Sequence, residues 1–245
     1  MKVWLNMRRI SLLAWLLAGL SACAGNAPEV RLEGKTTASG QQYSVFHPQG
    51  LAIQVTTSRP DVADRRVQLS VAGAYTDLDT DQPLDLLVAN GQVLQPTAKV
   101  GFLDGVLTII GDSLTISQIP KGQSPPGAEV ARVQRQRGTL LLQELLVYRG
   151  RSVRGPGGSF FQRRALVELA GHQWAVVESQ ADITMQQFAA DLVELGAQQA
   201  LNLDTGGWDE GWYRAGGQVV KLGNRRTDTA RQSNWLVFAR RAGNE

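Results

Sequence analysis

A carboxylate stands where a predicted strand runs into a glycine turn. The apolar run from Ala200 to Leu203 is typical of a strand, and Asp204-Thr205-Gly206-Gly207 follows it directly. Acidic residues at the carboxyl ends of strands are where α/β layers usually place ligand contacts. Aspartate beside glycine is also common in ordinary turns. The residue types therefore allow a catalytic Asp204, but by themselves they favour a turn.

Aromatic residues crowd the segment after this turn. Trp208, Trp212 and Tyr213 combine large apolar rings with a polar atom. Such side chains suit carbohydrate contacts and protein interfaces equally well. We expect them either to form a stacking platform for a sugar or to plug a pocket.

The acidic and histidine residues that could bind a metal ion lack the spacing of known metal sites. Aspartates alternate through residues 77–81, but Gln82 and Val88 stand where an EF-hand loop has glycine and glutamate. His47 and His172 are far apart and show no zinc-ligand spacing. We therefore expect no metal site and no cofactor, although the sequence leaves a divalent metal open.

The first residues predict export. Basic residues at positions 2, 8 and 9 precede an apolar run from Ile10 to Leu20 and a small-residue site, Leu20-Ser21-Ala22-Cys23. This is the layout of a signal peptide, and the run is too short for a permanent membrane span. The last four residues resemble the lipobox of bacterial lipoproteins. We predict a signal peptide over residues 1–22, a diacylglyceryl group on Cys23 and the lipid bilayer as a partner.

Charge and cysteine content fit this interpretation. The chain has 25 basic and 22 acidic residues, and loss of the three basic residues before Cys23 leaves 22 of each. A neutral mature chain has no electrostatic support for binding nucleic acid. Cys23 is the single cysteine, so no internal disulfide can form. Ala24 after the cysteine resembles lipoproteins sorted to an outer membrane, with the domain in the periplasm or at the cell surface.

The mature chain divides into a tether and one domain. Residues 23–41 are short of large apolar side chains and predict a flexible tether, and residues 42–242 predict a single domain. Short apolar segments separated by turn signals predict an antiparallel, strand-rich body with strands at 44–46, 51–56, 67–71, 84–88, 92–94, 106–110, 114–119 and 140–149. Asn90-Gly91 predicts a type I′ hairpin turn. The composition of residues 121–137 predicts an exposed loop that could cover a site.

One helix is specified in detail. Thr184 and Gln187 form a capping-box pattern, Ile183 and Phe188 stand at the staple positions, and Gly196 fits a C-terminal cap. Strand-like runs at 174–177 and 200–203 flank this helix. The pattern predicts a strand, helix and strand that end at Asp204.

Several segments together resemble one family. Gly196-Ala-Gln-Gln-Ala-Leu-Asn-Leu-Asp204-Thr-Gly-Gly resembles the G-A-x-x-A-L-N-L-D-G-G-G-S signature of phosphodiester glycosidases. Residues 71–75 are similar to its N-G/A-G-x-F/Y motif, 83–91 to P-x-G-L-x-x-x-N-G, 143–150 to Q-x-x-P-x-L-x-x-x-G, 163–165 to R-T-A and 231–235 to R-x-x-N-x. The segments occur in the family's order. The resemblance implies a single α/β domain with a mixed, strand-rich sheet and few helices.

The chemistry implied by the resemblance is hydrolysis of a sugar-1-phosphodiester or related glycan. Such a reaction needs a carboxyl group and cationic groups that bind the diester oxygens. Asp204 is the candidate carboxylate. The residues implied to bind the substrate are Arg163, Arg164, Asn202, Gly206, Gly207, Arg231 and Asn234. Arg163 and Arg164 alternate along a predicted strand, so we expect only one to face the site and the other to be solvated.

Departures from the family pattern keep a second hypothesis open. Val71 replaces the family's asparagine, and Trp208 stands among positions that are small in the family. Trp208 is a candidate sugar contact, and Asp209 and Glu210 are candidate substitute acids. The alternative is a non-catalytic glycan-binding or envelope-assembly lipoprotein with the same fold. An open cleft in which Asp204 and an arginine converge within hydrogen-bonding reach would favour the enzyme, whereas a cleft filled by Trp208 or Trp212 would favour the binder.

Overall fold

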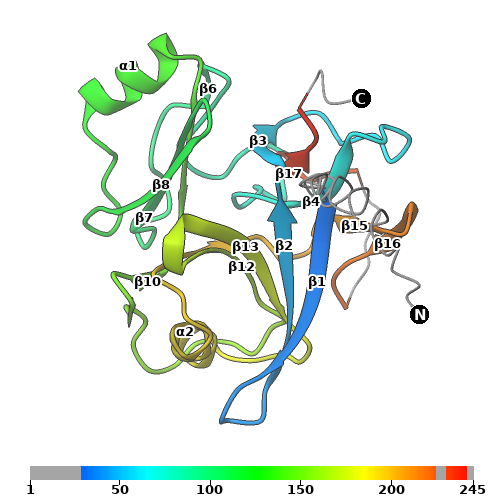
Figure 1. Ribbon diagram of the computed structural model, residues 1–245. Helices are drawn as coiled ribbons and strands as arrows, with labels where there is room; N and C mark the ends of the chain where they lie inside the picture. Colours follow the sequence, from blue (N-terminus) through cyan, green and yellow to red (C-terminus); the bar gives the residue numbers. More distant parts are fainter. Residues whose placement is uncertain (1–28, 225–229, 242–245) are drawn as a thin grey trace, which may run out of the picture.

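The computed structural model describes residues 29–224 and 230–241. The predicted signal peptide and the lipidation site at Cys23 lie outside the described residues. The described part folds into three sheets and two α-helices, with every strand pairing antiparallel (Figure 1). No helix in the described part is long and apolar enough to cross a membrane.

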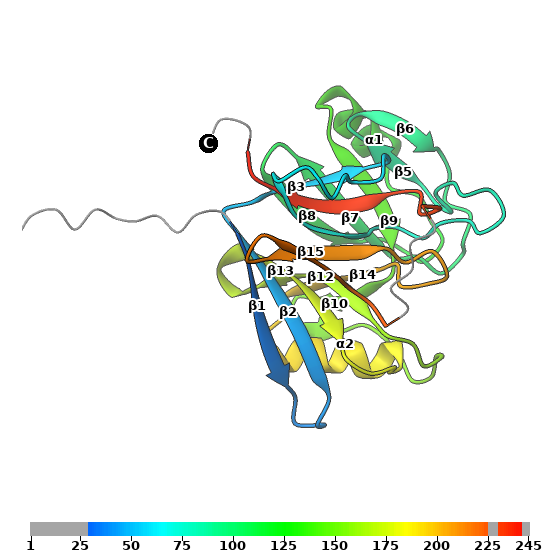
Figure 2. The ribbon, with the colours of Figure 1, turned by 90° about the vertical axis from the view of Figure 1, so that its right-hand side faces the viewer.

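The largest sheet carries most of the site. Its seven strands lie in the order β1 (Glu29–Thr36), β2 (Gln42–Gln49), β13 (Gln173–Ser179), β12 (Arg164–Leu169), β14 (Gln199–Leu203), β10 (Leu145–Tyr148) and β11 (Arg151–Ser152). A short 3₁₀ helix, Ala170–His172, joins β12 to β13. The helix α2 (Met185–Glu194) covers the outer face of this sheet (Figure 2).

Two five-stranded sheets complete the fold. One has the order β16 (Gln218–Lys221), β15 (Gly211–Ala215), β4 (Val67–Ala72), β17 (Trp235–Ala239) and β3 (Ala52–Thr56). The other has the order β6 (Gln92–Gln95), β5 (Leu87–Ala89), β9 (Thr139–Gln143), β7 (Gly105–Ile110) and β8 (Ser113–Gln118). The helix α1 (Gly127–Arg135) packs against this second sheet through the buried Val133.

The main core lies where the three sheets face one another. Phe46, Leu166 and Leu201 come from the seven-stranded sheet, and Leu69 and Leu107 come from the two smaller sheets. Burial of a leucine or phenylalanine side chain contributes about 1.5–3 kcal/mol, so this shared core fixes how the sheets meet. Strands from all three sheets therefore end at defined places relative to one another.

The predicted strand, helix and strand form around Asp204 with one strand inserted. Helix α2 connects β13 to β14, and β12 lies between these strands, antiparallel to both. The strands that flank the helix are therefore parallel to each other without being paired. The sequence predicted a mixed sheet, whereas the observed sheet has only antiparallel pairs because β12 separates the two parallel strands.

Local signals correctly predicted the ends of α2. The Thr184 side chain accepts a hydrogen bond from the Gln187 N–H at 3.1 Å, whereas the Gln187 side chain donates to Asp191 instead of closing the capping box. Gly196 has φ +94°, and hydrogen bonds from Gly196 to Val193 and from Ala197 to Leu192 complete a Schellman cap.

The hairpin prediction is also correct. Asn90 and Gly91 have φ of 51° and 80° between β5 and β6, as a type I′ turn requires. A Cβ on Gly91 would meet the Gln134 carbonyl oxygen at 2.7 Å, so glycine is needed for space as well.

Three expectations are corrected by the structure. Residues 29–36 of the predicted tether form β1, because β2 pairs with them along eight positions. Residues 127–135 of the predicted loop form α1, which buries Val133 and does not line the cavity described below. The strand predicted at 140–149 is two strands in different sheets, β9 and β10, which separate at Glu144.

The N-cap of α2 gives a stability prediction. Replacing Thr184 with alanine removes the side-chain acceptor for Gln187, and we expect the free energy of unfolding to fall by about 1 kcal/mol. Chemical denaturation measures this change. Thr80→Ala, in an exposed turn, is the control and should stay within about 0.5 kcal/mol of wild type. Equal effects of the two substitutions would contradict the capping role.

Candidate functional site

A cavity of about 530 Å³ opens where β4 and β14 end and β12 begins. It is lined by Tyr75, Thr76, Asp77, Leu78, Asp79, Leu84, Phe161, Arg163, Asn202, Asp204, Thr205, Gly206 and Gly207. Five of the residues expected at a site from the sequence therefore share one cavity: Arg163, Asn202, Asp204, Gly206 and Gly207.

Asp204 lines this cavity and is held by backbone amides. Its side chain accepts hydrogen bonds from Gly206 N–H at 2.9 Å and from Thr76 N–H at 3.4 Å, and the residue is only 6% exposed. Burial raises the pKa of the carboxyl to about 6, and the negative charge of Asp209 raises it as well. The hydrogen bonds from the two amides lower the pKa and only partly offset these effects. Near neutral pH the group can therefore both give and take a proton.

Asn234 fixes the end of β4 beside Asp204. Its side-chain amide accepts from Ala74 N–H at 2.7 Å and donates to the Ala74 carbonyl at 3.0 Å, and the Gly73 carbonyl accepts from Asp204 N–H at 2.9 Å. A Cβ on Gly73 would lie 2.4 Å from the Asn234 side-chain oxygen, so only glycine fits. Asn234 is fully buried, stiffens this turn and does not line the cavity.

Arg163 is the arginine that lines the cavity. Its Nε donates to the Ile183 carbonyl at 3.2 Å and its Nη2 to the Ser159 carbonyl at 2.6 Å, while the guanidinium lies 5.3 Å from the centre of the Phe161 ring. Burial lowers the pKa of this guanidinium. The two carbonyl contacts orient the group without neutralising its charge.

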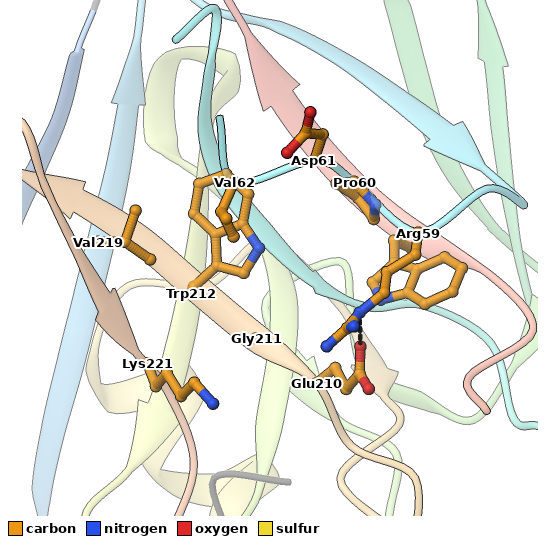
Figure 3. A pocket seen from close by; sticks show the side chains of 10 residues that line it. Arg59, Pro60, Asp61, Val62, Glu210, Gly211, Trp212, Val219 and Lys221 are labelled. Atoms are coloured by element: carbon orange, nitrogen blue, oxygen red, sulfur yellow. Dashed lines mark hydrogen bonds and ion pairs between the residues drawn. The ribbon is translucent and has the colours of Figure 1, made fainter. Parts of the chain in front are cut away.

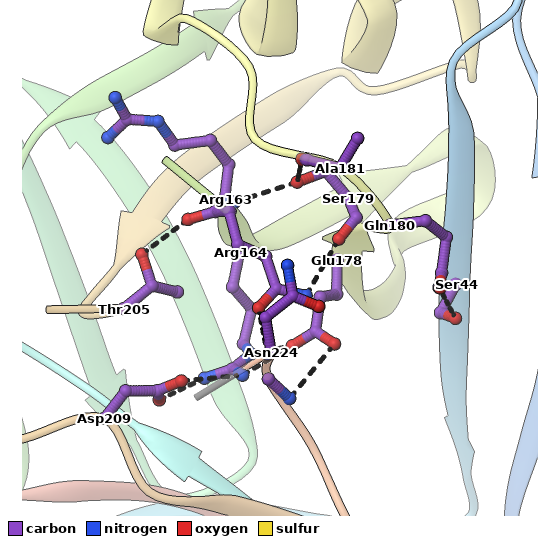
Figure 4. Close-up of polar contacts among 12 residues, drawn as sticks. Ser44, Arg163, Arg164, Glu178, Ser179, Gln180, Ala181, Thr205, Asp209 and Asn224 are labelled. Carbon is purple, nitrogen blue, oxygen red and sulfur yellow. Dashed lines mark hydrogen bonds and ion pairs between the residues drawn. The ribbon is translucent and has the colours of Figure 1, made fainter. Parts of the chain in front are cut away.

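Arg164 points the opposite way, as strand alternation predicts (Figure 4). The expectation that the second arginine is solvated was wrong, because Arg164 is fully buried. It donates to Glu178 at 2.7 Å through Nε and to Asp209 at 2.6 Å through Nη1. The two carboxylates compensate a charge that could not otherwise be buried.

A polar network that the sequence did not single out lies beside the cavity. The Tyr75 hydroxyl donates to Glu144 at 2.8 Å and accepts from the Asn202 side-chain amide at 2.9 Å. Glu144 also pairs with Arg154, which in turn contacts Asp104. Burial and the adjacent Glu144 raise the pKa of Tyr75. The signal available in the sequence was the position of Glu144 directly after a buried strand.

The other two predicted acids lie outside this cavity. Asp209 is buried against Arg164, and Glu210 pairs with Arg59 at 2.9 Å in a separate pocket of about 450 Å³ (Figure 3). Trp212 lines that second pocket and is 8% exposed. The structure therefore does not bring Asp209 or Glu210 together with Asp204 as cavity carboxylates.

The tryptophans leave the cavity open. Trp208 lies under the Arg231 guanidinium, 4.2 Å from the ring centre, and Arg231 pairs with Asp81 at 2.9 Å. Neither Trp208 nor Arg231 lines the cavity. Val71, the departure from the family's asparagine, is fully buried in the main core and does not line it either. The cavity is lined by both Asp204 and Arg163 and is not filled by Trp208 or Trp212. The Arg163 side chain donates to Ile183 and Ser159, and among the described residues no hydrogen bond joins it to Asp204. The geometric expectation for the enzyme hypothesis is therefore met only in part.

The described residues hold no cluster of three or more histidine, cysteine, aspartate or glutamate side chains that could bind a metal. The cavity groups can supply acid–base chemistry on an anionic or polar ligand: a carboxyl with a pKa of about 6, an oriented guanidinium and the Gly207 amide.

Comparison with protein families decides the relationship. The family model described as phosphodiester glycosidase matches residues 65–239. The chain belongs to the phosphodiester glycosidase family. The match spans the whole cavity and more than half of the chain, whereas no curated protein sequence matches it.

Solved structures show the same fold at low sequence identity. The catalytic domain of zebrafish N-acetylglucosamine-1-phosphodiester alpha-N-acetylglucosaminidase, auto-inhibited by its pro-peptide, is 14% identical, with a TM-score of 0.60 over 89% of this chain and 85% of that one. A hypothetical protein from Synechocystis is also 14% identical, with a TM-score of 0.57 over 88% of this chain and 64% of that one. The present chain thus spans less than two thirds of the second protein.

The raised pKa of Asp204 gives a testable pH dependence of stability. The folded-state pKa of about 6 exceeds the ordinary value of 3.8, so the stability that wild type has below pH 4 is lost as the pH rises through 6. Relative to Asp204→Asn, wild type should lose about 2 kcal/mol between pH 4 and 7. Denaturation at several pH values measures the difference. Asp79→Asn, an exposed neighbour, is the control, and a pH-independent difference for Asp204→Asn would contradict the assignment.

Proposed function

We propose that this chain is an exported, lipid-anchored phosphodiester glycosidase that hydrolyses a sugar-1-phosphodiester or a related glycan. The observation that carries the proposal is the buried Asp204, with a pKa of about 6, in one cavity with the oriented Arg163. Family membership supports the reaction class. No cofactor and no nucleic acid are part of the proposal.

Asp204 acts as the general acid in this proposal. Its protonated form donates to the phosphate oxygen that leaves the anomeric carbon, and a water oxygen forms the new bond to that carbon. Arg163 binds the diester and stabilises the charge on the departing phosphate. Gly207 lets its backbone amide approach the anion because it carries no side chain. The Gly206 N–H is already donated to Asp204.

Glu144 is the proposed acceptor for the proton of the attacking water. It receives a hydrogen bond from the Tyr75 hydroxyl, which lines the cavity. Tyr75 can take the water's proton while it passes its own proton to Glu144. The reaction then balances, with the free sugar and the phosphate monoester as products. Asn202 donates to Tyr75 and orients this hydroxyl.

A non-catalytic glycan-binding or envelope-assembly lipoprotein is the second candidate. It is favoured by the loss of two expected phosphate ligands from the cavity, since Arg164 is committed to Glu178 and Asp209 and Arg231 pairs with Asp81. A single arginine suffices to hold an anionic ligand but gives a weaker clamp than several.

Turnover separates the two candidates. Purified mature protein should release sugar from an N-acetylglucosamine-1-phosphodiester, and Asp204→Ala should lower kcat at least about 100-fold because the proton donor is lost. Arg163→Met should raise KM about 10-fold or more through loss of a charged hydrogen bond. Arg132→Met, exposed on α1, is the matched control and should behave as wild type. Binding of the sugar phosphate without turnover in folded protein would favour the second candidate.

The anchor is proposed from the sequence. Cys23 would carry two acyl chains, and each buried methylene contributes about 0.8 kcal/mol, so the attachment would be stable. The proposed location is the cell envelope, with the lipid in the outer membrane and the domain in the periplasm or at the cell surface.

Labelling tests the anchor directly. Cells fed labelled palmitate should incorporate the label into wild type, and Cys23→Ala should lose it because the thiol acceptor is gone. Arg132→Met again serves as the control and should keep the label. Wild-type protein that folds, is exported and carries no label would overturn the lipoprotein proposal.

A further inference from the structure

The buried arginine behind the cavity is bound by two carboxylates from different segments. Arg164 donates to Asp209 through Nη1 at 2.6 Å and Nη2 at 3.2 Å, and to Glu178 through Nε at 2.7 Å. Its side chain has no exposed surface. Removing both carboxylates would leave an uncompensated buried charge, which is strongly destabilising. The three side chains, named here the Arg164 triad, therefore form a rigid unit.

The Arg164 triad is connected to Asp204 through the backbone of one short loop. Asp209 N–H donates to the Gly206 carbonyl at 3.3 Å, and Gly206 N–H donates to the Asp204 carboxyl at 2.9 Å. A Cβ on Gly223 would lie 2.7 Å from an Asp209 carboxyl oxygen, so this chain segment closes over the triad without space to spare. Movement of Asp209 would therefore displace the amide that holds Asp204.

The Arg164 triad also carries charge. Two carboxylates on one guanidinium leave one net negative charge, in surroundings where charges are screened less than in water. The charge of Asp209 is one cause of the raised pKa of Asp204. Asp209 is also linked to Asp204 through the Gly206 backbone, whereas Glu178 lies on β13 outside this loop. The other groups around Asp204 are Tyr75, Asp77 and Asp79 after β4, Arg163 before β12 and the neutral Gln232.

We propose that Arg164 and Asp209 are positioning residues for Asp204: the Arg164 triad fixes the loop that carries this carboxyl and holds a negative charge beside it. The inference rests on the proposed function only in that Asp204 is the acid. It assigns Asp209 a role without contact to substrate, because Asp209 does not line the cavity.

Substitution of each of the two carboxylates that contact Arg164 separates a positioning role from a role in fold stability alone. Asp209→Asn and Glu178→Gln each remove one carboxylate charge from Arg164 and leave the other to compensate it. Carboxyl NMR of the substrate-free protein follows the titration of Asp204. We expect Asp209→Asn to lower the midpoint toward the ordinary aspartate value and Glu178→Gln to leave it near 6. Asp209→Glu should restore the wild-type midpoint by restoring the charge.

Activity gives the second measurement. If Asp204 is the acid, the alkaline limb of the plot of kcat against pH should move to lower pH in Asp209→Asn. In Glu178→Gln it should remain at the wild-type position. Equal shifts in the two variants, or no shift in Asp209→Asn, would overturn the inference. Absence of turnover in every variant would count against the proposed function alone, because the NMR titration needs no substrate. Should Asp209→Asn fail to fold, a shifted midpoint in Asp209→Glu would overturn the inference and an unshifted one would support it.

Discussion

The buried charge of Arg164 is the constraint on which the arrangement of the site depends. A guanidinium without solvent contact is tolerated only with carboxylates in good geometry, here Glu178 on β13 and Asp209 after β14. If the loop that carries Asp204 moved away from β12, Asp209 would leave Arg164 and the buried guanidinium would lose one of its two compensating carboxylates. The same contact that stabilises the fold sets the position of the candidate acid.

Two departures from the family pattern meet in this contact. By the resemblance to the family's motifs, Arg164 stands at the threonine of R-T-A, and Asp209 follows a turn that differs from the G-G-G-S of the signature. Considered separately, each weakens the resemblance. In the structure they bond to each other away from the cavity, so the altered turn keeps the Asp204 side open.

Antiparallel pairing explains why the cavity lies where it does. The end of β14 pairs with the start of β12, Leu203 with Arg164, which places Asp204 beside Arg163. Asn234 and Gly73 then lock the end of β4 onto Asp204. Separation of β9 from β10 at Glu144 places a second carboxylate behind Tyr75. Two sheets therefore border the cavity, and the third supplies the strand that precedes Glu144 behind it.

The sequence by itself determined the features that depend on near neighbours in the chain. The Thr184 and Gly196 caps, the Asn90-Gly91 turn and the opposite directions of Arg163 and Arg164 follow from local geometry. Only the tertiary structure decided the partners of Arg164, Asp209 and Glu144, because ion pairs join residues that are distant in sequence. Alternation shows that two side chains diverge, but which one meets solvent, substrate or a buried carboxylate depends on the strands packed on either side.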